Sequence, residues 1–181
     1  PYRQDEIWEL SKEFNFKIIE DASHAFGANY KNNIVGNCKW SDITVFSFHP
    51  VKIFTTGEGG AITTNDKNLN KTLRILRDNG LERNPKNFKL KNTKSWYYEH
   101  QLLGYNYRMN DIQASLGISQ LKKIKKFKLK RKKIAKFYNQ QFSKKINIEL
   151  PVFEKNFDPS LHLYIIKIKK NKRDNLLVKL R

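Results

Sequence analysis

The stretch SFHPVKIFTTGEGG, residues 47–60, places one lysine, Lys52, between the end of an apolar run and a glycine-rich turn. A free lysine has a pKa near ~10.4, so it attacks a carbonyl at neutral pH only when burial or neighbouring positive charge lowers that pKa. Lys52 lies in the most apolar and least lysine-rich part of the chain. The stretch therefore predicts a Schiff-base lysine.

Upstream of Lys52, a short apolar run ends in the sequence EDASHA, residues 20–25. A lysine that carries pyridoxal 5'-phosphate (PLP) needs a carboxylate at the ring nitrogen, hydrogen-bond donors around the phosphate and a flat group over the ring. Asp21, Ser47 and His24 are candidates for these three roles, in that order. Two ordinary alternatives stay open, with Ser47 as a plain strand end and His24 as a loop histidine.

Hydrophobic periodicity predicts an α/β arrangement. We expect helices over 2–14 and 67–77, strands over 16–20, 42–48 and 61–64, and a hairpin over 28–35. Asp21 and Lys52 each follow the end of a strand. Because ligands of α/β sheets gather beyond the carboxyl ends of the strands, both residues can face one crevice.

Three blocks of the chain, residues 20–27, 46–60 and 104–114, follow one another in the order found in a known family. The chain resembles the DegT/DnrJ/EryC1/StrS sugar-nucleotide aminotransferases, from about residue 17 to 120 and more loosely to the C-terminus. The resemblance implies a PLP-dependent fold type I α/β domain, with a mixed, mostly parallel sheet and flanking helices.

The resemblance also divides the chain into three parts. It implies part of the PLP-binding large domain over 1–120, a long basic connecting helix over 121–141 and the start of a small C-terminal domain over 142–181. Family members are longer, so we expect a fragment that lacks a phosphate-binding loop and an aromatic cover for the ring.

The activity implied by the resemblance is transfer of an amino group from glutamate to a nucleotide-linked keto sugar. Lys52 and Asp21 would be catalytic, His24 and Ser47 would contact PLP, and Asn106 would reach the cofactor phosphate of the other subunit of a homodimer. The sequence FHPVK, residues 48–52, is most similar to that of the branch of UDP-4-amino-4,6-dideoxy-N-acetyl-altrosamine transaminases. A rival is the sugar dehydratase branch, which has histidine at the lysine position. A further alternative is an inactive fragment.

The net charge of +19 suggests a basic protein that binds nucleic acid or an acidic surface. Ten of the fifteen residues from 122 to 136 are Lys or Arg, however, and the apolar residues among them lie near one helical face. We interpret this segment as a solvated helix and expect no nucleic-acid or membrane partner. The single cysteine, Cys38, cannot form a disulfide within the chain, which fits the reducing cytoplasm. No spacing of Cys and His residues predicts a metal site.

Overall fold

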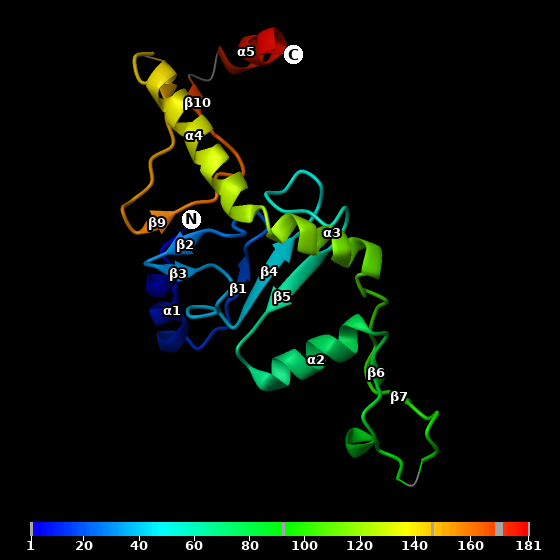
Figure 1. Cartoon of the computed structure of the whole chain (residues 1–181). Coiled ribbons are helices and arrows are strands. Elements are labelled where there is room, and N and C mark those ends of the chain that lie inside the picture. The colour runs from blue at the N-terminus through cyan, green and yellow to red at the C-terminus, as the bar shows by residue number, and fades with distance from the viewer. Residues whose placement is uncertain (1, 92, 146, 169–171, 181) are drawn as a thin grey trace.

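The computed structural model describes residues 2–91, 93–145, 147–168 and 172–180 (Figure 1). Its elements are, in chain order, α1 (Gln4–Glu13), β1 (Ile19–Asp21), β2 (Asn29–Tyr30), β3 (Asn33–Ile34), β4 (Ile43–Ser47), β5 (Gly60–Thr63), α2 (Lys67–Arg77), β6 (Leu81–Glu82), the 3-10 helix η1 (Pro85–Asn87), β7 (Glu99–His100), α3 (Asp111–Leu121), α4 (Ile124–Phe142), β8 (Ile148–Glu149), β9 (Phe157–Asp158), β10 (Lys167–Ile168) and α5 (Arg173–Leu180).

The central sheet has the strand order β1-β4-β5. β1 runs parallel to β4, with Asp21 opposite Val45, whereas β5 runs antiparallel to β4, with Gly60 opposite Ser47. The sheet is therefore mixed, as the resemblance implied. The carboxyl ends of β1 and β4 lie at one edge, and the loop over 48–59 crosses that edge.

Most predicted elements form close to their expected bounds. The helix expected over 2–14 is α1, and the strand expected over 16–20 shortens and shifts to β1, because residues 19–21 are the ones that pair with β4. α2 has the bounds that the sequence predicted, and Asp66 caps it by accepting hydrogen bonds from the backbone of Asn68 and Leu69. The hairpin forms as β2 and β3.

An aromatic cluster fastens the loop over 48–59 to the sheet. Phe54 stacks on Phe26 with ring centroids 4.8 Å apart and meets Phe48 edge-to-face at 4.7 Å. Phe46, Phe48 and Phe54 are all buried. The helix α3 closes over the same loop, since a Cβ at Gly117 would lie 2.9 Å from the Thr56 methyl group.

The basic segment forms α4, which leaves α3 after a break at 122–123. Its expected apolar face is covered only in part: Ile124 packs on the aromatic cluster, but Ile134 and Phe137 are exposed. Past α4, the chain returns to the β2–β3 hairpin, where β9 pairs with β2 to form a second three-stranded sheet in the order β3-β2-β9. No helix among the described residues is long and apolar enough to cross a membrane.

Candidate functional site

Lys52 lies on the loop that joins β4 to β5. The two residues after it, Ile53 and Phe54, are buried, and the Lys52 N–H donates to the carbonyl of His49 at 2.9 Å. The backbone of Phe48 closes the loop, because its N–H donates to the carbonyl of Gly59 at 2.8 Å. Lys52 is therefore half-buried, on a turn whose next two residues are packed into the core.

Two positions at the end of this loop have no room for a side chain. Gly59 has a φ of +149°, and a Cβ there would lie 2.5 Å from the Thr56 hydroxyl oxygen. A Cβ at Gly60 would lie 2.6 Å from the carbonyl oxygen of Phe46. Both positions thus need glycine because the loop passes close to its own backbone and side chains.

Asp21 ends β1 at the same sheet edge. Its Oδ1 accepts hydrogen bonds from the hydroxyl of Ser23 at 2.5 Å and from the Ser23 N–H at 2.9 Å. These two hydrogen bonds lower the pKa of the Asp21 carboxyl, and electrostatic interactions with His24 and Lys52 lower it further, against a smaller opposing effect of burial. Asp21 is therefore ionised at neutral pH, and Lys52 lies near enough to act on it electrostatically.

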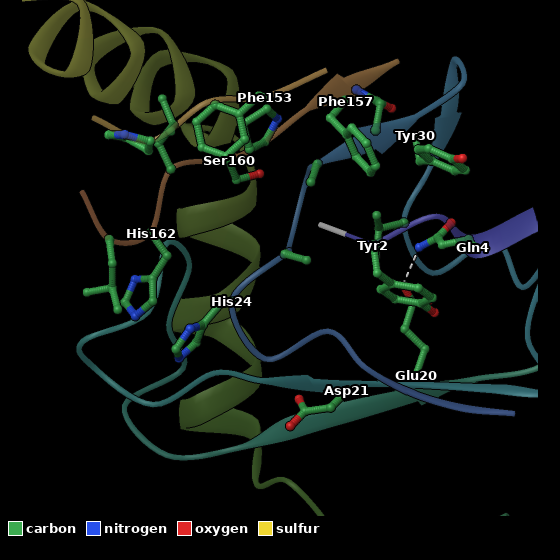
Figure 2. Close-up of a pocket in the computed structure, with 18 of the residues that line it drawn as sticks. Tyr2, Gln4, Glu20, Asp21, His24, Tyr30, Phe153, Phe157, Ser160 and His162 are labelled. Atoms are coloured by element: carbon green, nitrogen blue, oxygen red, sulfur yellow. Dashed lines mark hydrogen bonds between the residues drawn. The ribbon is translucent and has the colours of Figure 1, made fainter. Parts of the chain in front are cut away.

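A cavity of about 390 Å³ opens beside Asp21 (Figure 2). One wall comes from the chain around β1 and β2, and the other comes from residues 151–165. Its lining is mainly aromatic and apolar, with a polar side formed by Asp21, His24, Ser160 and His162. Glu20 also reaches the lining, but its carboxylate accepts hydrogen bonds from Gln4 and from the hydroxyl of Thr44, so it supports its neighbours.

His162 is a site residue that sequence reasoning missed. Its ring lies against the His24 ring, with centroids 4.4 Å apart and planes at 61°. Its Nδ1 is buried and has no hydrogen-bond partner among the described residues. Burial lowers the pKa of His162, and electrostatic interactions with His24, Lys52 and Arg131 lower it further, so the ring is neutral at pH 7.

The structure brings together some of the predicted site residues and separates others. Asp21 and His24 share the cavity, and Lys52 acts electrostatically on both Asp21 and His162. Ser47 ends β4 at the same sheet edge, where its hydroxyl accepts from the N–H of His49 at 3.4 Å, but it does not line the cavity.

Asn106 lies elsewhere, at the C-terminal end of α2. It forms an isolated β-bridge with Asp78, is exposed and does not line the cavity. The neighbouring Arg108 has a structural contact, since it forms an ion pair with Asp78. Although burial raises the pKa of Asp78, hydrogen bonds from Arg83 and Arg108 lower it more, so the ion pair is charged at neutral pH.

Comparison with known proteins gives this arrangement a family. Residues 2–181 match the model of the DegT/DnrJ/EryC1/StrS aminotransferase family. The chain belongs to this family. It is 40% identical over 165 residues to the UDP-4-amino-4,6-dideoxy-N-acetyl-beta-L-altrosamine transaminase of Campylobacter jejuni serotype O:23/36, a match that covers 90% of this chain and 40% of the relative.

Solved structures show the same fold. The Helicobacter pylori PseC aminotransferase, involved in pseudoaminic acid biosynthesis, superposes with a TM-score of 0.86 and 30% identity, covering 99% of this chain and 46% of PseC. The PLP form of the sugar aminotransferase Spr1654 from Streptococcus pneumoniae gives a TM-score of 0.83 and 29% identity, covering 99% of this chain and 49% of that one. This DegT/DnrJ/EryC1/StrS chain thus spans about two-fifths of the length of the curated relatives it matches.

The side chains at the sheet edge fit PLP as this family uses it. An ionised carboxylate, Asp21, and an exposed imidazole, His24, line the cavity. Lys52 does not line it but lies near enough to act electrostatically on Asp21. These groups suit a cofactor with a ring nitrogen at one end and an aldehyde on the ring. Within the described part of the chain, no group of three or more His, Cys, Asp and Glu side chains is placed to hold a metal ion.

Proposed function

We propose that the chain supplies the PLP-binding lysine and aspartate of an aminotransferase that acts on a nucleotide-linked keto sugar. The observation that carries the proposal is that, in a family member, Asp21 ends β1, Lys52 follows the end of the parallel strand β4, and Lys52 acts electrostatically on Asp21. When bound, PLP supplies an aldehyde and an electron-withdrawing ring.

The chain's own groups then have distinct tasks. The Lys52 amine would hold the cofactor through its aldehyde carbon and, once released, would move a proton from the alpha carbon of the amino donor to that cofactor carbon. The Asp21 carboxylate would keep the ring nitrogen protonated. Since Ser23 uses Oδ1 of Asp21, we assign Oδ2 to that nitrogen. His24 would lie beside the ring, and Ser47 would donate to the phosphate.

The substrate proposal rests on the relatives. We infer a UDP-linked 4-keto-6-deoxy hexosamine as amino acceptor and glutamate as donor, because the altrosamine transaminases of Campylobacter jejuni are among the most similar curated proteins. A relative named GDP-perosamine synthase, from Caulobacter vibrioides, is 36% identical over 140 residues, so a GDP-linked sugar is the outcome to compare against.

A dehydratase function is the second candidate, since the dTDP-4-dehydro-2,6-dideoxy-D-glucose 3-dehydratase of Saccharopolyspora spinosa is 31% identical over 182 residues. Lys52 argues against a dehydratase. Amination needs an amine that holds the aldehyde and moves a proton, whereas the dehydratase branch of the family has histidine at the position of Lys52.

We also propose an organisation for the whole protein. Residues 1–120 would belong to the PLP-binding domain, 121–141 to a connecting helix and 142–181 to the small domain of a cytoplasmic homodimer. In that dimer Asn106, which lies apart from the cavity of its own chain, would serve the cofactor phosphate of the other subunit. Asn106→Ala should then weaken PLP retention, and a competent monomer with unchanged retention would refute this role.

A spectrum of the purified protein with PLP tests the core of the proposal. We expect an absorption band at roughly 400–430 nm that Lys52→Ala removes and that the exposed-lysine control Lys67→Ala keeps. Far-ultraviolet circular dichroism checks that both variants fold. A band that survives in Lys52→Ala would exclude Lys52 as the attachment site. Incubation with glutamate and keto sugars linked to UDP, GDP or dTDP then identifies the acceptor, and turnover of dTDP sugars alone would refute the UDP assignment.

A further inference from the structure

One arginine of the basic helix α4 makes a contact that a solvated helix does not need. Arg131 is half-buried, and its Nη1 donates to the carbonyl oxygens of Leu161, at 3.2 Å, and His162, at 3.1 Å. Hydrogen bonds from a charged donor are among the stronger ones in proteins. Arg131 thus bridges two consecutive carbonyls of the segment that carries the cavity residue His162.

The bridged segment has an unfavourable backbone. Leu161 has a φ of +55°, in the left-handed region that a bulky L-residue rarely adopts. Such a conformation persists only where the surroundings hold it. Arg131 binds the carbonyl of this residue and of the next, so it is placed to hold the turn.

Neighbouring contacts fix the same segment from both sides. Lys128 and Lys132, on the same face of α4, form ion pairs with Asp158. On the opposite side, the hydroxyl of Ser160 donates to the carbonyl of Phe26 at 2.6 Å, and Ser160 is buried. The segment 158–162 is therefore held on two sides, and the His162 side chain extends from it toward His24 (Figure 2).

We propose that Arg131 is a positioning residue, which fixes the His162 ring against His24 in the cavity by holding the left-handed turn at Leu161. It acts through the backbone and is not among the residues that line the cavity. The consequence for catalysis rests on the proposed function: because His162 shares the cavity with Asp21 and His24, moving its ring would alter how the sugar nucleotide is bound.

The test measures the two histidine rings directly, by NMR of histidine-labelled protein without cofactor or substrate. The charged and titratable groups near His162 are His24 from the chain after β1, Lys52 from the loop over 48–59 and Arg131 from α4. Asp21, at the end of β1, lines the same cavity. In Arg131→Met we expect the nuclear Overhauser contacts between the His24 and His162 rings to weaken and the pKa of His162 to rise toward its ordinary value. Lys133→Met, at an exposed position of the same helix, should change neither.

Two further variants separate positioning from charge. Arg131→Lys keeps the charge but not the planar fork, so it should restore the ring contacts only in part. Leu161→Gly removes the steric penalty of the turn. The loss of His24–His162 ring contacts caused by Arg131→Met should therefore be smaller in the Leu161→Gly background. The double variant also allows the measurement if Arg131→Met alone does not fold.

The outcomes distinguish this inference from the proposed function. Unchanged ring contacts and titration in folded Arg131→Met would overturn the positioning role, and so would an equal loss with and without Leu161→Gly. Neither result bears on amination. If the ring contacts behave as expected but the unmodified protein neither binds PLP nor aminates a sugar nucleotide, the proposed function fails and the positioning role stands.

Discussion

Phe54 stacks on Phe26 with the ring planes only 17° apart, and this contact joins the loop of Lys52 to the chain that follows Asp21. Phe54 is almost fully buried, so the stack couples the two sides of the candidate PLP site through the core. The positions of Lys52 and Asp21 at the sheet edge therefore depend on an apolar contact that neither residue makes.

The first prediction concerns this contact. Phe54→Ala should lower the free energy of unfolding by about 3–5 kcal/mol, since it removes a buried ring from a packed aromatic cluster. Phe54→Leu keeps most of the volume and should cost about 1.5 kcal/mol or less. Denaturant unfolding measures both. Equal and small losses in the two variants would show that the cluster does not support the loop.

A second prediction separates the glycines of the same loop. Gly60→Ala should cost about 1–3 kcal/mol, because the added methyl group would overlap the carbonyl oxygen of Phe46 and push β5 away from β4. Gly57→Asn is the matched control, because Gly57 has a φ of +81°, which asparagine tolerates, and open space around its Cα.

For Gly57→Asn we expect a change within about 0.5 kcal/mol, as for an ordinary surface substitution. Both variants can be compared by denaturant unfolding and by PLP binding. A loss as large in Gly57→Asn as in Gly60→Ala would contradict the close approach of β5 to Phe46.

Local chemistry was readable from the sequence where neighbouring residues decide it. The strand end before Lys52 and the bounds of α2 both depend on short-range pattern. The contacts of His162 with His24 and Arg131 were not readable, because they join parts of the chain far apart in sequence and leave no local periodicity.

The helix α4 shows the same limit from another side. Its periodicity predicted an apolar face and a solvated basic remainder. The structure instead uses Lys128, Arg131 and Lys132 to fasten the second wall of the cavity and leaves Ile134 exposed. Periodicity identifies which residues share a face, but tertiary packing decides which face is covered.

The third prediction follows from the contacts of Asp21. Ser23→Ala removes the hydroxyl donor, which is the largest cause of the lowered pKa, so the pKa of the Asp21 carboxyl should rise toward its ordinary value. Ser23→Thr keeps a hydroxyl and should keep the lowered pKa. NMR titration of the Asp21 side-chain carboxyl measures the shift, and an unchanged titration in Ser23→Ala would remove Ser23 from the site.

The same change has a functional counterpart if the proposed function holds. Asp21 binds the protonated ring nitrogen only while it is ionised, so a raised pKa should move the acid limb of the activity profile to higher pH. Asp21→Asn, which cannot ionise, should slow amination strongly at every pH. An unchanged acid limb in Ser23→Ala would mean that another group controls it.

The fourth prediction concerns Glu99, whose carboxylate organises the long segment between α2 and α3. It accepts hydrogen bonds from the N–H groups of Lys89, at 2.9 Å, and Leu90, at 3.0 Å, and from the Gln101 side chain at 2.7 Å. Burial raises the pKa of Glu99, but these hydrogen bonds outweigh burial and lower it to about 2.

A lowered folded-state pKa means that the stabilisation is complete above the unfolded pKa, near ~4.3 for glutamate, and is lost as the pH falls through the folded value. Between those limits, the protection of the Lys89 and Leu90 amides against hydrogen exchange, measured relative to the intrinsic rate at each pH, should fall because the segment opens more often. Glu99→Gln should show faster exchange already at neutral pH, because the amide offers a single uncharged acceptor oxygen in place of a carboxylate. The exposed Glu58→Gln is the control and should leave both amides unchanged. Protection of the Lys89 and Leu90 amides that does not fall with acid, or that is equal in Glu99→Gln and in Glu58→Gln, would show that the segment is held by other contacts.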